Sequence, residues 1–165
     1  MKKLLALAVV ILGFTAVSFG QVSATATASA TIVSPIAIVN AGNLNFGNVA
    51  TSNALGTVTI DPAGTRSSLG GVTLPATVGT VGAAHFTVSG TTDYTYSISA
   101  IAPIQVDFGA FNMVVDNFVT TPTPTGKLTG GSETINVGAT LHVAANQNPG
   151  LYVSTVPFKV TVNYN

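Results

Sequence analysis

The feature that most constrains the fold is a two-residue alternation of apolar and polar side chains, clearest near the C terminus. Because successive side chains of a strand point to opposite faces, the pattern predicts a strand over residues 151–164 with one buried and one solvated face. Pro157 lies on the polar face and lacks a backbone donor, which fits an edge position or a bulge. The apolar face would carry Tyr152, Val156, Phe158, Val160, Val162 and Tyr164.

The same alternation recurs along the rest of the chain between Gly, Pro and Asn turn signals. Residues 24–32 have the shallowest apolar face, formed mainly by alanines. The chain has 24 Thr, 12 Ser and 17 Gly but only 6% charged residues, so good helix formers are scarce. Eight or nine short strands predict a single all-β domain, an immunoglobulin-like sandwich. The other predicted strands are residues 36–39, 44–46, 57–60, 85–89, 94–99, 112–119 and 134–143.

Residues 1–20 are predicted to be a cleaved Sec-type signal peptide. Lys2 and Lys3 precede an apolar run over residues 4–14 and a small-residue stretch over 15–20. A membrane anchor is the alternative, but the run is shorter than the ~20 residues that a bilayer needs. Cleavage after Gly20 and cleavage after Ala24 both fit. The β-domain would then span residues 21–165 and be exported to the periplasm, the cell surface or the medium, with no further membrane span.

The sequence contains few residues suited to catalysis, metal binding or nucleic-acid binding. Residues 21–165 carry three basic and five acidic side chains, so the basic surface of a nucleic-acid binder is missing. His85 and His142 lie inside strand patterns, without a metal-ligand spacing around them. Asp107 and Asp116 would share a calcium ion only if their loops met. We therefore predict no catalytic, cofactor-binding or metal site, and no enzymatic activity.

Five segments of the chain carry a resemblance to a known family. They are LNFG at 44–47, TVTIDPAG at 57–64, AHFTVSG at 84–90, VGATLHVAANQ at 137–147 and VTVNYN at 160–165. On these segments the chain resembles a secreted bacterial domain family of unknown function, which is distantly similar to spore-coat-U-type domains and to pilin subunits of chaperone–usher systems. The resemblance covers nearly all of residues 21–165.

The resemblance to pilins implies an assembly mechanism. In pilins a periplasmic chaperone holds the C-terminal strand, and the N-terminal extension of another subunit then completes the sandwich by β-strand addition. Residues 21–33 would be the donor or an edge strand, although alanines fill pockets poorly and the Cys pair of many pilins is missing. Pairing of residues 24–33 within their own domain is the alternative. The resemblance marks as assembly residues Gly150, Tyr152, Phe158, Val160, Val162, Tyr164, Ala26, Ala28, Ala30 and Ile32.

These observations predict an exported, non-enzymatic structural subunit of a Gram-negative surface filament or coat, with a pilin-like sandwich that assembles by β-strand addition. Its partners would be other copies of itself or a periplasmic chaperone, and not nucleic acid. The alternative is a monomeric secreted or surface-associated module that binds a glycan or a protein through loops at residues 64–71 or 120–127.

Overall fold

The computed structural model describes residues 20–165, so the predicted signal peptide lies outside the described residues except for Gly20. The chain divides into two units between Ile32 and Val33. Residues 20–32 form no helix or strand, and every residue from 20 to 35 is exposed. The prediction of a strand over residues 24–32 is therefore wrong for a single copy of the chain. Alternating alanines bury too little apolar surface to hold a strand in place.

Residues 33–165 consist of short and long strands joined by turns. Within residues 20–165 there is no α-helix, and the one helical turn is the 3₁₀ segment Thr129–Gly131. No helix of this part of the chain has the length and apolarity to cross a membrane. The strands are β1 (Ala37–Gly42), β2 (Asn45–Phe46), β3 (Ala50–Ile60), β4 (Arg66–Thr73), β5 (Val81–Gly82), β6 (Ala84–Ser89), β7 (Thr95–Ile98), β8 (Ile104–Phe108), β9 (Phe111–Thr121), β10 (Thr125–Lys127), β11 (Ser132–Val143) and β12 (Val162–Tyr164).

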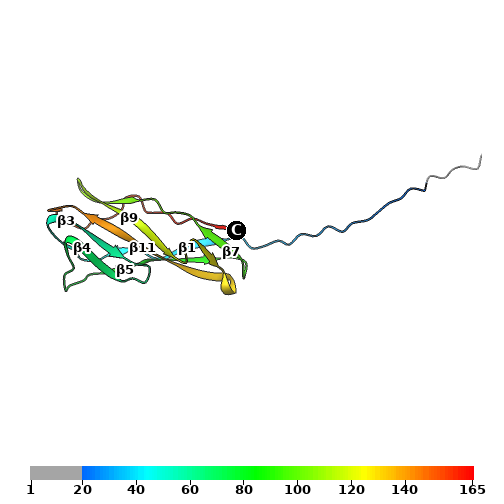
Figure 1. The fold of residues 1–165 in the computed structure, drawn as a ribbon, viewed down its shortest axis with the longest axis horizontal. Helices are drawn as coiled ribbons and strands as arrows, with labels where there is room; N and C mark the ends of the chain where they lie inside the picture. Colours follow the sequence, from blue (N-terminus) through cyan, green and yellow to red (C-terminus); the bar gives the residue numbers. More distant parts are fainter. Residues whose placement is uncertain (1–19) are drawn as a thin grey trace, which may run out of the picture. The chain divides into compact units, whose positions relative to one another are not determined.

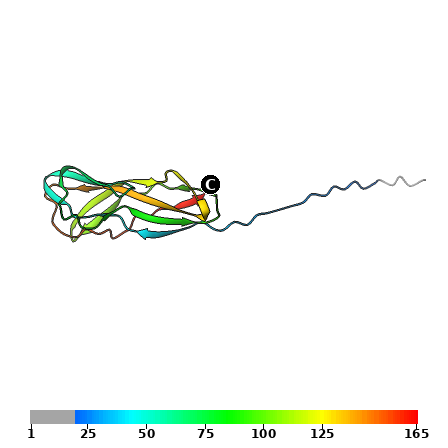
Figure 2. The ribbon, with the colours of Figure 1, turned by 90° about the horizontal axis from the view of Figure 1, so that it is seen from below.

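The strands form an all-β sandwich, which confirms the predicted fold class. A seven-stranded antiparallel sheet has the order β1-β6-β11-β3-β4, with β9 pairing with both β11 and β8. A three-stranded sheet, β10-β7-β12, forms part of the opposite layer, and β2 pairs with β5. Figures 1 and 2 show β11, in orange, running along the middle of this unit with other strands on either side.

Strand β11 organises the large sheet. Its first half pairs with β6 and its second half with β3, while β9 runs along the opposite edge. The alternation of its sequence places polar side chains such as Asn136 and His142 on the outer face. The inner face carries a continuous buried apolar row, which consists of Ile135, Val137, Ala139, Leu141 and Val143.

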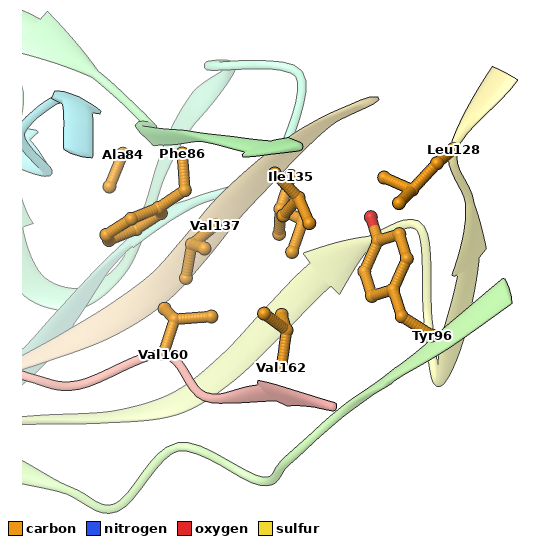
Figure 3. Packing of buried hydrophobic residues seen from close by; sticks show 9 residues of the cluster. Ala84, Phe86, Tyr96, Leu128, Ile135, Val137, Val160 and Val162 are labelled. Carbon is orange, nitrogen blue, oxygen red and sulfur yellow. The ribbon is translucent and has the colours of Figure 1, made fainter. Parts of the chain in front are cut away.

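The inner row of β11 contributes to two hydrophobic clusters. Figure 3 shows the first, in which Phe86, Ile135 and Val137 of the large sheet point toward the side chains of β7 and the C-terminal segment. Val160 and Val162 belong to this cluster, so the predicted contribution of the last segment to the core is confirmed. The second cluster joins the far half of β11 to side chains of β3, β4 and β9.

The C-terminal segment differs from its prediction. We expected one strand over residues 151–164, but only Val162–Tyr164 is a strand, and Val153 forms an isolated bridge with Asp107. Val156, expected on the buried face, is 73% exposed. Pro157 explains the interruption, because it has no N–H and restricts the backbone of the residue before it.

Two predicted loops also proved to be largely strand. Residues 64–71, expected to be a turn region, contain most of β4, because Gly70 and Gly71 lie at an irregularity in the pairing with β3 and do not end the strand. Residues 120–127, expected to be an exposed Pro-rich loop, contain the end of β9 and all of β10. The short strands β5 and β8 were not predicted, because two and five residues carry too little alternation to be recognised.

Gly138 lies where β11 exchanges β6 for β3 as its partner. A Cβ at this position would overlap the carbonyl oxygen of Ile60 and lie 2.7 Å from the carbonyl carbon of Asp61, both of which are backbone atoms. We predict that Gly138→Ala lowers the free energy of unfolding by about 1–3 kcal/mol, as overpacking usually does. Urea unfolding measures the change. Gly82→Ala is the matched control, because a Cβ there has no neighbour within 4 Å, and equal midpoints for both variants would contradict the prediction.

Tyr96 closes one end of the first cluster. Its side chain is fully buried, and its Oη donates to Glu133 Oε2 at 2.9 Å. Burial, followed by the hydrogen bond to Glu133 and the negative charge of that carboxylate, raises the pKa of Tyr96 above its ordinary value of 10.0. The neutral phenol is thus favoured in the folded state.

Alkaline pH should therefore destabilise the fold. Below the unfolded-state pKa of about 10 the contribution of Tyr96 is intact. Above that pH the unfolded chain ionises first, so the free energy of unfolding falls by about 1.4 kcal/mol per pH unit until the folded-state pKa is reached. Urea unfolding at about pH 8 and about pH 11 measures this loss. Tyr96→Phe should remove most of it, whereas Tyr94→Phe, at a residue 41% exposed, should not. An unchanged loss in Tyr96→Phe would refute the assignment.

Candidate functional site

The predicted assembly residues at the C terminus do share one side of the chain. Val160 and Val162 are buried, and Phe158 and Tyr164 are half-buried against the same cluster. The ring of Phe158 lies 4.9 Å from that of Phe118 and 6.0 Å from that of Phe86, measured between centroids. This side of the segment is therefore anchored in the sandwich.

Few backbone groups of the same segment form hydrogen bonds within the domain. Val153 pairs with Asp107 and Val162 with Ile98, so residues 153–162 run antiparallel to residues 98–107 without a slip in register. Between the two paired ends only the carbonyl of Thr161 accepts a bond, from the N–H of Ser99 at 3.0 Å. Within the described part of the chain, no backbone–backbone hydrogen bond includes residues 154–160.

All backbone partners of residues 153–164 come from one side, that of β7 and β8. The opposite side, which we name the C-terminal edge (residues 153–164), has no strand partner among residues 20–165. Buried or half-buried backbone N–H and C=O groups are normally paired, and an unpaired strand edge is a template for another strand. The C-terminal edge thus carries backbone groups that no strand of the described residues pairs with.

Tyr164 holds the end of the C-terminal edge to its own domain. Its Oη donates to the carbonyl of Ser34 at 2.9 Å and accepts the N–H of Thr91 at 2.7 Å. Ser34 in turn donates its N–H to Thr91 Oγ1 at 2.9 Å, and the ring of Tyr94 packs edge-on against that of Tyr164. These contacts fix Ser34, which follows the predicted donor segment by one residue.

Gly150 and Tyr152 lie at the other end of the C-terminal segment, beside a cavity of about 350 Å³. The cavity is lined by inward side chains such as Met113 and Leu141. Tyr152 Oη donates to the carbonyl of Asn148 at 2.8 Å, and the Tyr152 ring packs against Phe108. A Cβ on Gly150 would overlap the Phe108 ring, so the close approach of the chain requires glycine here.

The N-terminal assembly residues Ala26, Ala28, Ala30 and Ile32 are exposed, with Ile32 at 93%, and they belong to no strand. No charged residue occurs between Gln21 and Asn40. The segment is therefore an uncharged chain with an apolar row and a hydroxyl row, without regular secondary structure of its own.

A groove of about 460 Å³ lies on the outer face of the large sheet, a feature that the sequence did not reveal. The exposed side chains of Leu55, Leu69 and Val114 line it, together with Thr57 and His142. These residues come from β3, β4, β9 and β11, which are far apart in sequence, so only the strand register identifies them as neighbours.

Both histidines make polar contacts on the outer face. His142 Nε2 lies 2.7 Å from Asp116 Oδ1, and His85 Nδ1 lies 2.7 Å from Asn136 Oδ1. Asp107, the other acid considered for a shared calcium ion, accepts the Thr155 hydroxyl at 3.1 Å. Among residues 20–165, no three His, Asp or Glu side chains are grouped closely enough to share a metal ion.

Comparison with known families gives one match. The family described as a domain of unknown function (DUF4402) matches residues 36–164, which is most of the chain. No curated protein and no solved structure shows a significant match.

The contacts of Tyr164 lead to a stability prediction. Tyr164→Phe removes a donor to Ser34 and an acceptor for Thr91, so we expect the free energy of unfolding to fall by about 1–2 kcal/mol. Tyr94→Phe is the control, because Tyr94 is 41% exposed and the substitution keeps the ring that packs against Tyr164. Thermal unfolding of both variants checks the expectation, and indistinguishable midpoints would count against it.

Proposed function

We propose a structural role for this chain, which belongs to the family of the domain of unknown function DUF4402. In this proposal the protein is an exported, non-enzymatic subunit of a bacterial surface filament or coat. Copies assemble when the N-terminal segment of one copy adds a strand to the sandwich of the next. The unpaired backbone of residues 154–160, beside a well-packed core, is the observation that carries the proposal.

The two segments match in length and pattern. Residues 24–32 would extend over about 30 Å as a strand, close to the length of residues 153–162. Side chains directly opposite each other on paired strands point to the same face. An added strand could therefore place Ala28 and Ala30 on the core-facing side, beside Phe158 and Val160, and its hydroxyl row toward solvent.

The added strand would bind mainly through its backbone. Each backbone hydrogen bond contributes about 0.5–1.5 kcal/mol net, and pairing satisfies groups on both segments. The alanines add little to the binding free energy, since each buries only one methyl group, which contributes about 0.8 kcal/mol. Ile32 supplies the one large apolar side chain of the donor row.

The other parts of the proposal rest on the sequence. Residues 1–20 have the pattern of a Sec signal, which supports export. The Gram-negative periplasm or cell surface is what the resemblance to chaperone–usher pilins implies. A periplasmic chaperone is the partner that would cover the C-terminal edge before assembly, because an exposed strand edge otherwise pairs indiscriminately.

A binding module for a glycan or a protein is the second candidate. The groove formed by Leu55, Leu69 and Val114 around His142 is the observation that favours it. The same groove argues against a sugar that stacks on aromatic rings, because none of its lining residues is Phe, Tyr or Trp. We therefore rank this function below assembly.

We predict that Ala28→Lys weakens self-association of the exported chain at least about tenfold, because the charge would face the core of the neighbouring copy. Thr27→Lys is the matched control, since its side chain would point to solvent. Size-exclusion chromatography over a range of concentrations and electron microscopy measure assembly.

Deletion of residues 21–33 should abolish this assembly. Equal effects of the two Lys substitutions would argue against a strand with one buried face. A full chain that stays monomeric at high concentration, with and without a periplasmic chaperone, would rule out the structural role. Specific capture of a glycan by that monomer would establish the binding module instead.

A further inference from the structure

The cavity beside Gly150 and Tyr152, which we name the Tyr152 cavity, has no role in strand addition. Its volume is about 350 Å³, and residues 45–51 and 147–152 line it together with inward side chains of the large sheet. Neither loop that the sequence suggested for ligand binding, residues 64–71 and 120–127, contributes to it. The cavity is therefore a distinct candidate for a binding site.

The floor of the Tyr152 cavity is apolar. Leu141 of β11 is buried in the second hydrophobic cluster, and Met113 of β9 is half-buried against it. The aromatic rings of Phe46 and Tyr152, both half-buried, also line the cavity. A ligand that covers this floor must have an apolar face, because apolar surface is favourably buried only against apolar groups.

The walls of the cavity carry uncharged polar side chains. Asn45 and Asn48 lie in one wall and Gln147 and Asn148 in the other, and each amide offers both donors and an acceptor. None of the described residues that line the cavity is Asp, Glu, Lys, Arg or His. A charged ligand would lose its hydration there without a counter-charge, so the cavity favours a neutral ligand.

The wall formed by residues 45–51 is held by hydrogen bonds to the rest of the domain. Arg66 Nη1 donates to the carbonyls of Phe46 at 2.9 Å and Asn48 at 3.0 Å. Asn48 Nδ2 donates to the carbonyl of Thr77 at 3.0 Å. The domain itself thus positions this wall, and a ligand does not have to order it on binding.

The opposite wall presents an oriented acceptor at Gln147. Its Nε2 donates to Tyr152 Oη at 2.9 Å and to the carbonyl of Asn112 at 3.2 Å. Both amide hydrogens are thereby used, which leaves Oε1 as the atom that can accept a ligand hydroxyl. Tyr152 Oη donates in turn to the carbonyl of Asn148 at 2.8 Å, so the Tyr152 ring is fixed as well.

We propose that the Tyr152 cavity binds the ring of a neutral sugar. A sugar ring presents C–H groups, which suit the apolar floor, and hydroxyl groups, which both donate and accept as the wall amides do. An entirely apolar ligand would leave those amides without partners. The volume lies near the lower end of the range for small-molecule sites, which fits one ring and not a long chain. Such binding goes beyond the proposed assembly and does not require it.

Met113 provides a reporter in the cavity. Met1 lies in the predicted signal peptide, so Met113 is the one methionine of the exported chain, and its isotopically labelled methyl group gives one NMR signal. We expect at least one of glucose, galactose, mannose and N-acetylglucosamine to shift that signal in a saturable way, with a Kd on the order of millimolar. The charged sugars glucuronate and glucosamine should bind at least about tenfold more weakly.

Two cavity variants test the walls. Gln147→Ala should weaken binding of the same sugar at least about tenfold, because Oε1 is lost. Asn148→Ala should also weaken binding, and it keeps the backbone carbonyl to which Tyr152 donates. Gln105→Ala is the matched control, since Gln105 is exposed on β8 and does not line the cavity. Circular dichroism identifies a variant that fails to fold.

The absence of a saturable shift with all four neutral sugars would overturn the proposal, as would equal binding of the charged sugars. Binding that is unchanged in the folded cavity variants would overturn it too. A shift with a synthetic peptide of residues 21–33, but with no sugar, would replace the sugar by the donor segment and support strand addition. Binding of an immobilised glycan that ends in the same sugar would identify a surface glycan as the source, whereas binding of the monosaccharide alone would identify a free sugar.

Discussion

The pairing of β11 with three other strands is the interaction on which the rest of the fold depends. β11 is long enough for β6 and β3 to follow each other along one edge, and Gly138 leaves room for the backbone of β3 where they meet. One unbroken apolar row from Ile135 to Val143 then serves both hydrophobic clusters. The three-stranded sheet and the C-terminal segment pack against this row and against the buried side chains of β6.

The strand pairing leaves several strands of both sheets at an edge. β1, β4 and β12 each have a single partner in the described part of the chain. Disulfides are excluded by the absence of Cys, and charges that would block edges are few. Backbone pairing is therefore both the main stabilising pattern within the domain and the main means by which it could bind another chain.

The sequence predicted the fold class and most long strands because their alternation is strong, as in β6, β9 and β11. The strand predictions were wrong for segments that alternate in sequence but do not form a paired strand with a buried face. Residues 24–32 alternate but have only small side chains, whereas residues 154–160 alternate but contain Pro157. The outer groove and the contact between Tyr164 and Ser34 join residues far apart in the chain, and a single sequence contains no information on such distant pairs.

The small side chains of the donor segment have a consequence for assembly. Alanine rows give each added strand little apolar burial, so binding would depend on many backbone bonds that form together. Such contacts are individually reversible and become strong only when several act at once. The donor segment carries no charged residue between Gln21 and Asn40, so the contact would depend little on salt.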